Sequence, residues 1–219
     1  KVFENSFLVC VDGKSKGVFK TLPEEYKNLP LKDYEDKLII PGMVDLHVHA
    51  PQYAFRGMCM DLELMDWLNQ YTFPEEEKYT NLDYAQKAYS IFAKALKNSA
   101  TTRACIFATR HREATVLLME LMEKTGLVSY VCKVNMDREA SQALVEESVE
   151  SSAYQTFGWI NSVYDNFQNT KPILTPRFIP CCTDELMEEL KQIQMTYGIP
   201  VQSHLSESPG EIEFVKFLR

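Results

Sequence analysis

From residue 38 onward, short apolar runs alternate with longer stretches in which apolar residues recur every three or four positions. The short runs are rich in β-branched residues, which is typical of buried strands, and the longer stretches have the period of helices that pack by one face. The predicted strands cover 38–47, 101–107, 128–135, 172–178 and 200–204. The predicted helices cover 82–98, 112–124, 141–164 and 183–197, and a further helix begins after Pro209.

Five strand-then-helix units in series predict a parallel sheet, because each return to the same edge needs a crossover connection. A doubly wound sheet and a closed barrel both satisfy this pattern. No G-x-G-x-x-G or P-loop string follows any strand, which disfavours a nucleotide-binding doubly wound fold. A (β/α)8 barrel needs eight units, so we expect residues 38–219 to be the first five units of a barrel whose remainder is missing.

The first 37 residues have a different pattern. Alternating apolar positions over 2–11, a turn at Asp12-Gly13 and a second short run at 17–19 indicate a β-hairpin. We therefore expect residues 1–37 to form a separate small β unit.

Charge and cysteine content narrow the class of partner. The net charge is −8, from 23 Lys and Arg against 31 Asp and Glu, and an acidic surface repels nucleic-acid backbones and anionic membranes. No apolar run approaches the roughly 18 residues of a membrane span, and the first residues lack a secretory signal pattern. The six cysteines contain no C-x-x-C, so we expect a cytoplasmic protein with reduced thiols that acts on a small molecule.

Two of the four histidines, His47 and His49, stand two positions apart at the end of the first predicted strand. On a strand this spacing directs both rings to one face, at the carboxyl end where barrel active sites lie. The pair is typical of metal ligands, although two packed or solvated histidines would give the same spacing. Asp45 continues the alternation and is expected to hold a histidine ring or a loop amide.

A third histidine, His204, ends the fifth predicted strand, and Glu207 follows it by three residues. A carboxylate beside a metal, but not bound to it, can transfer protons between a metal-bound water and a leaving group. An isolated H-x-x-E string is weak evidence for such a site. Its occurrence together with the His47 and His49 pair favours a metal-dependent hydrolase.

These residues resemble those of a known family. The string PGMVDLHVHA resembles the first-strand signature of the amidohydrolase superfamily, and QSHLSE resembles the fifth-strand histidine and H-x-x-E of its purine and pyrimidine deaminase branch. The strings HAPQY, MDWLNQYTFP and TPRF, in this order, narrow the resemblance to members that act on guanine. The similarity covers nearly the whole chain.

The resemblance implies one zinc ion per subunit, with Fe²⁺ as an alternative, held by His47, His49 and His204. It also implies a sixth-strand histidine and an eighth-strand aspartate as further ligands, both beyond residue 219. His111 follows the second strand and therefore cannot replace the sixth-strand ligand. Family members also build a small β-sandwich from both chain ends and are commonly homodimers, so both features are expected here.

The resemblance further implies a purine pocket. Gln52 would bind a purine edge through its amide, Arg177 would bind the carbonyl and a ring nitrogen, and Phe178 would pack on the base. Trp67 and the following YTFP segment would form a loop over the pocket. His204 would contact substrate as well as metal.

Other polar groups are expected to have ordinary roles. Adjacent Cys181 and Cys182 are predicted to be small packed residues rather than nucleophiles. The acidic residues at 74–77 are predicted to form a helix start or a solvated turn, and those at 146–152 a solvated helix face.

The reaction implied by the resemblance is hydrolytic deamination of guanine to xanthine and ammonia, with Glu207 as the proton-transferring residue. Two alternatives stay open. A related hydrolase could act on a triazine, a pterin or a modified nucleoside, or the chain could belong to a non-catalytic scaffold that has lost its metal.

Overall fold

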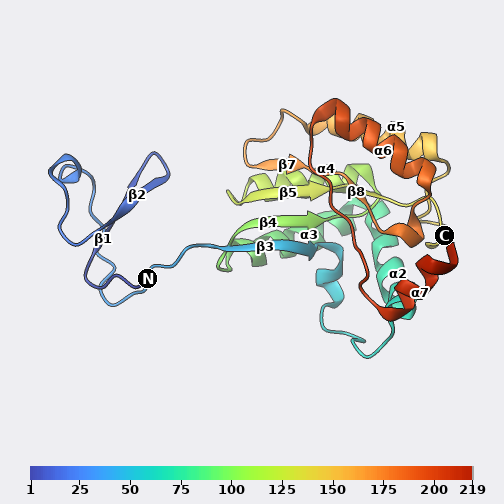
Figure 1. Cartoon of the computed structure of the whole chain (residues 1–219), viewed down its shortest axis with the longest axis horizontal. Coiled ribbons are helices and arrows are strands. Elements are labelled where there is room, and N and C mark those ends of the chain that lie inside the picture. The colour runs from blue at the N-terminus through green and yellow to red at the C-terminus, as the bar shows by residue number, and fades with distance from the viewer. Residues whose placement is uncertain (219) are drawn as a thin grey trace. The chain divides into compact units, whose positions relative to one another are not determined.

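The computed structural model describes residues 1–218 and divides into two compact units, Lys1–Pro41 and the residues from Gly42 onward (Figure 1). In the described part of the chain, no helix is both long and apolar enough to cross a membrane.

The first unit contains the predicted hairpin. Strands β1 (Phe7–Val11) and β2 (Lys14–Phe19) pair antiparallel, with Phe7 opposite Phe19. Asp12 and Gly13 connect them with positive φ angles of 51° and 70°, the backbone that matches the twist of a two-residue hairpin. A 3-10 helix, η1, covers Glu24–Tyr26.

The second unit contains a parallel sheet in the order β3-β4-β5-β7. The four strands are β3 (Met43–His49), β4 (Thr101–Phe107), β5 (Val128–Cys132) and β7 (Thr170–Pro172). The short strands β6 (Val134–Asn135) and β8 (Thr175–Pro176), which follow β5 and β7 in the sequence, form a second parallel pair. The expectation of a parallel α/β fold is confirmed, and the four strands follow one another in sequence order.

Four strand predictions were wrong in their extent. The expected strand 128–135 is divided into β5 and β6, and the expected strand 172–178 is reduced to the end of β7 and the two residues of β8. The apolar residues at 38–40 are exposed and lie outside the first strand, which begins at Met43. Pro41 has no N–H to give to a ladder, so hydrophobicity alone misplaced this boundary. The fifth strand is reduced to a single bridge between Leu174 and Val201, although Gln202 and His204 still donate backbone hydrogen bonds to Leu174 and Arg177.

Five longer helices accompany the sheet: α3 (Leu82–Lys97), α4 (Arg112–Glu123), α5 (Val149–Val163), α6 (Asp184–Tyr197) and α7 (Pro209–Leu218). Side chains at the N-caps of three of them accept backbone N–H groups: Asn81 at α3, Ser148 at α5 and Thr183 at α6. The Ser148 cap explains why the third predicted helix begins at Val149 and not at residue 141.

Both faces of the sheet carry buried apolar side chains. Along β4, Ile106 belongs to the cluster shared with the long helices, and the next residue, Phe107, belongs to a second cluster with Phe73 and Phe178. Because successive strand residues point to opposite faces, the two clusters lie on opposite sides of the sheet. The second cluster is therefore on the face that bears His49, which pairs with Phe107 in register.

Residues 51–80, part of which was expected to be a loop, are largely helical. They form η2 (Pro51–Phe55), α1 (Leu64–Trp67), the π-helical turn η3 (Leu68–Thr72), α2 (Phe73–Glu77) and η4 (Lys78–Thr80). In Figure 1, α2 and α7 lie beyond the carboxyl ends of the parallel strands. The YTFP string is therefore helix, with Phe73 buried in the second cluster.

The acidic run at 74–77 lies in the first turn of α2, so the helix-start alternative is confirmed and the solvated-turn alternative is wrong. The solvated helix face expected at 146–152 is wrong at Glu146. Glu75 and Glu76 of α2 are buried, and so is Glu146. Glu146 forms an ion pair of 2.5 Å with Lys133, and both side chains are fully buried. The Glu146 carboxylate also accepts hydrogen bonds from Ser152 Oγ and the Met136 backbone N–H. A single sequence does not show that each carboxylate has a buried partner.

Candidate metal centre

The three histidines of the predicted metal site lie together. Strand β3 supplies His47 and His49, whose ring centroids are 5.2 Å apart. His204 arrives on the segment after the Val201 bridge, where its backbone N–H donates to the Arg177 carbonyl at 3.0 Å. One ring nitrogen from each histidine lies within 4.8 Å of the others, so the predicted cluster is present.

The rings of His49 and His204 are each fixed by a contact with a group outside the histidine cluster. His49 stacks on Phe107, with centroids 4.4 Å apart and planes 13° from parallel. His204 Nδ1 lies 2.7 Å from the Arg177 carbonyl oxygen. A carbonyl only accepts, so Nδ1 carries the proton and Nε2 presents a lone pair.

This arrangement fits a metal ion. The Nε2 atoms of His49 and His204 face each other at 3.0 Å. If His49 donates across this gap, its Nδ1 holds an unprotonated lone pair, and that atom is buried without a hydrogen-bond partner among the described residues. If it does not donate, two lone pairs oppose each other. A cation held by the two rings would remove this repulsion, and imidazole nitrogens are common ligands of divalent metals.

Burial keeps these imidazoles neutral. It lowers the pKa of His49 well below its usual value, and the positive charge of Arg177 lowers it further. Burial also lowers the pKa of His204, to about 4, although the hydrogen bond to the Arg177 carbonyl acts in the opposite direction. Neutral imidazole is the form that binds metal, so these side chains are ready as ligands at neutral pH.

Asp45 and His111 lie outside the metal-ligand cluster. Asp45 Oδ1 accepts the backbone N–H of His47 at 3.1 Å, so it holds an amide of its own strand. His111 precedes α4, and its Nδ1 lies 2.9 Å from Thr109 Oγ1. Burial and the nearby charges of Arg110 and Lys133 lower the pKa of His111 to about 4.

The Arg177 carbonyl contacts His204, and the Arg177 side chain has a partner that the sequence did not predict. Its Nη1 donates to Glu76 Oε2 at 2.7 Å in a buried ion pair. Its guanidinium also stands 5.1 Å from the Phe73 ring centroid. Burial works to lower the pKa of Arg177, but the Glu76 carboxylate outweighs it and raises the pKa above its ordinary value.

The other predicted pocket residues lie on separate elements, and Phe178 is the one with a ring contact to the histidine cluster among the described residues. Phe178 is buried, with its ring 6.4 Å from that of His204. Gln52 is half-buried in η2, three residues after His49. Trp67 ends α1, packs against Phe55 at 5.6 Å and donates from Nε1 to the Met58 carbonyl at 3.3 Å. That these three side chains contact substrate stays a prediction.

The turn that carries Glu207 is held by a buried carboxylate. Glu207 itself is exposed, and its backbone N–H donates to Glu211 Oε2 at 2.5 Å. Glu211 also accepts the Ser206 N–H at 3.2 Å. Ser208 Oγ accepts the Glu211 N–H and donates to Glu63 Oε1 at 2.8 Å. The sequence signal for this arrangement was the S-x-x-E capping box at Ser208.

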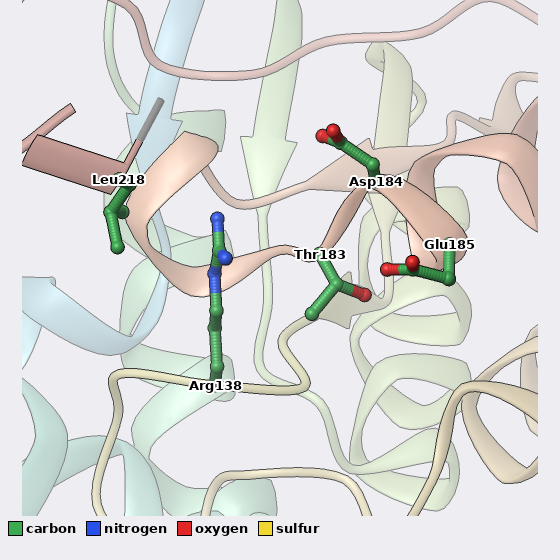
Figure 2. A pocket seen from close by; sticks show the side chains of 5 residues that line it. All are labelled: Arg138, Thr183, Asp184, Glu185 and Leu218. Carbon is green, nitrogen blue, oxygen red and sulfur yellow. The ribbon is translucent and has the colours of Figure 1, made fainter. Parts of the chain in front are cut away.

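Two hollows are lined by none of His47, His49 and His204. One, of about 130 Å³, is lined by Arg138, Thr183, Asp184, Glu185 and Leu218, and Figure 2 shows the Arg138 guanidinium standing between Leu218 and the start of α6. The second, of about 300 Å³, lies beside the start of α4, around Arg110 and His111.

Cys181 and Cys182 are buried in the two apolar clusters. Burial raises the pKa of both thiols, that of Cys182 to about 12. Thiolates are therefore rare at neutral pH, which agrees with packed residues and not with nucleophiles.

Comparison with known proteins identifies the family. Residues 38–218 match the amidohydrolase family. The chain is 42% identical over 184 residues to guanine deaminase of Rattus norvegicus, across 83% of this chain and 40% of that protein. It is 36% identical over 189 residues to guanine deaminase of Escherichia coli K12, across 86% of this chain and 42% of that protein.

A crystal structure of guanine deaminase from C. acetobutylicum, with guanine bound in its active site, superposes with a TM-score of 0.95 at 45% identity. That match covers 100% of this chain and 52% of the other. The chain thus spans about 40% of the curated relatives' length and about half of this structure. Taken with the parallel α/β fold and the His47, His49 and His204 cluster, the match places this chain in the amidohydrolase family.

Proposed function

We propose that this chain provides the first part of a metal-dependent guanine deaminase, which hydrolyses guanine to xanthine and ammonia. One observation carries the proposal. The Arg177 carbonyl binds both the backbone N–H and Nδ1 of His204, so the expected purine-binding residue and an expected metal ligand are one hydrogen bond apart.

His47, His49 and His204 would hold the metal, with zinc as the first choice and Fe²⁺ as the alternative. When bound, zinc would lower the pKa of a water to about 7 and so supply hydroxide at neutral pH. By the family resemblance, a sixth-strand histidine and an eighth-strand aspartate would complete the ligand set.

The remaining roles belong to side chains of this chain. Arg177 would donate to the purine carbonyl and ring nitrogen, Gln52 would bind the purine edge, and Phe178 would pack on the base. Together with His204 and Trp67, they would orient the amino-bearing carbon toward the metal. Glu207 would protonate the adjacent ring nitrogen and assist the departing ammonia.

We further propose that the sheet is the first part of a (β/α)8 barrel. Strand β3 is at the edge of the sheet, and its Val44 and Leu46 are 53% and 76% exposed. An exposed apolar edge strand favours pairing with another strand, which the eighth strand of a barrel would provide. The hairpin unit would correspondingly be part of the family's small β-sandwich. A cytoplasmic homodimer is the proposed assembly, on the family resemblance alone.

The proposal is tested with the zinc-loaded complete gene product and guanine, by following purine absorbance and ammonia release together. Xanthine with stoichiometric ammonia is the expected result. Bound zinc without guanine turnover would favour a related hydrolase for a triazine, a pterin or a modified nucleoside. Failure to bind zinc would favour the non-catalytic scaffold.

A further inference from the structure

The ion pair between Arg177 and Glu76 is sealed from solvent. The Arg177 side chain is 3% exposed and that of Glu76 is 0% exposed. The two residues are 101 positions apart in the sequence, and the π-helical turn η3 leads into the helix that carries Glu76. π-Helical turns are rare and occur frequently at functional sites.

The guanidinium is held by several neighbours. Nη1 donates to Glu76 Oε2 at 2.7 Å and lies 3.7 Å from Met136 Sδ, while the Phe73 ring packs against the group. Glu76 Oε1 is buried and has no hydrogen-bond partner among the described residues. Arg177 is therefore the one hydrogen-bonded partner of this carboxylate in the described part of the chain.

A buried ion pair contributes little to stability, because desolvation of both charges offsets their attraction. The ion pair has a larger effect on ligand binding than on stability. An unpaired buried guanidinium attracts anions strongly in a site of low dielectric constant. With Glu76 bound, the pair has no net charge, and an anionic ligand would approach a carboxylate as well as the guanidinium.

We infer that Glu76 is a positioning residue that neutralises and orients Arg177, so that the site selects a neutral purine over an anionic one. This inference rests on the proposed function, in which Arg177 binds the purine carbonyl. The remaining guanidinium N–H groups then act as directional donors and not as a net positive charge. Glu76 itself does not contact the reacting atoms.

The test compares purine-6-carboxamide, which is neutral, with purine-6-carboxylate, which is anionic and similar in shape. Their dissociation constants are measured by calorimetry on the zinc-loaded complete protein and on its Glu76→Gln variant. We expect the variant to shift the ratio toward the carboxylate by about tenfold or more. An unchanged ratio would overturn the proposal.

Glu75→Gln is the matched control. Glu75 is the preceding residue on α2 and is also buried, but its carboxylate pairs with Lys78 and Tyr84 instead of Arg177. It should leave the ratio at the wild-type value. A shift of the same size in Glu75→Gln would show that any disturbance of α2 produces the effect, and would also overturn the proposal.

A double-mutant cycle tests whether Glu76 acts through Arg177. In an Arg177→Gln background, Glu76→Gln should cause no further rise in the KM for guanine, and additive effects would contradict the mechanism. If Glu76→Gln alone does not fold, Glu76→Asp replaces it. Glu76→Asp keeps the negative charge but places the carboxylate farther from the Arg177 guanidinium. The KM for guanine should therefore rise, while the carboxylate-to-carboxamide ratio stays near the wild-type value. An unchanged KM would overturn the inference.

Failure of the proposed function would be seen in a different measurement from failure of this inference. A wild-type protein that does not deaminate guanine refutes that function. The carboxylate-to-carboxamide ratio is a binding measurement and still decides whether Glu76 controls the charge preference of Arg177.

Discussion

The Nε2 atoms of His49 and His204 lie 3.0 Å apart although the two residues are 155 positions apart in the sequence. The Arg177 carbonyl fixes the proton of His204 on Nδ1, so its Nε2 lone pair faces the His49 ring. Each of the two residues is therefore oriented by groups outside the cluster, His49 by stacking on Phe107 and His204 by the carbonyl.

Removal of either facing imidazole should release the metal. We expect His49→Gln and His204→Gln to weaken zinc affinity by more than the roughly 10- to 100-fold that loss of a supporting residue costs. Metal content after dialysis against a chelator measures this. His111→Asn is the control, because His111 lies outside the cluster. Full zinc retention in both glutamine variants would contradict the site.

Glu207→Gln should separate catalysis from metal binding. The amide cannot transfer the proton, so kcat should fall by about 10²- to 10⁴-fold while zinc content remains at the wild-type level. Steady-state kinetics and metal analysis of one preparation give both values. Loss of zinc would instead assign Glu207 to metal retention.

Glu211→Gln should act on the same turn indirectly. The buried Glu211 carboxylate accepts the Ser206 and Glu207 backbone N–H groups, and Ser206 has a strained φ of 55°. Without that charge the turn loosens, so kcat should fall roughly tenfold with little change in KM. Glu213→Gln on the same helix, where Glu213 forms an exposed pair with Lys216, provides the comparison. Equal kcat in the two variants would rule out the positioning role.

Lys133→Met should strongly destabilise the protein, because it leaves the Glu146 carboxylate buried without its cation. We expect a loss of about 3–5 kcal/mol in the free energy of unfolding, and partial recovery when Glu146→Leu is added. Lys191→Met removes the exposed pair with Glu188 and should cost less than about 1 kcal/mol. Denaturant titration compares the three variants. Similar losses for Lys133 and Lys191 would contradict the prediction.

Stability should fall in mild acid, partly because of His111. Its pKa is about 4 in the fold and about 6.5 when unfolded. As the pH falls from 6.5 to 4, the unfolded chain binds a proton that the folded chain does not, so the free energy of unfolding decreases, by up to about 3 kcal/mol. His111→Asn should flatten this part of the profile. Identical slopes for wild type and variant would show that His111 does not titrate this way.

The periodicity of the chain by itself determined the strand-helix units and the parallel order of the sheet. The reason is local: strand and helix periods mark which face of each element is buried. The position of His47 and His49 on one face of β3 was also predictable from the local sequence, because their spacing of two residues is the strand repeat. The boundaries at Pro41 and Ser148 were missed because a proline or a cap can outweigh an apolar run.

The partners of buried charges were decided only by the tertiary structure. Glu76 and Glu146 stand in acidic stretches that are typical of solvated surfaces, yet Arg177 and Lys133 lie against them. Such a pairing joins segments 101 positions apart in one case, and no local pattern encodes it. These two carboxylates are buried where the fold supplies a partner of opposite charge. For Glu76 that partner is present only once α2 packs at the carboxyl ends of the strands.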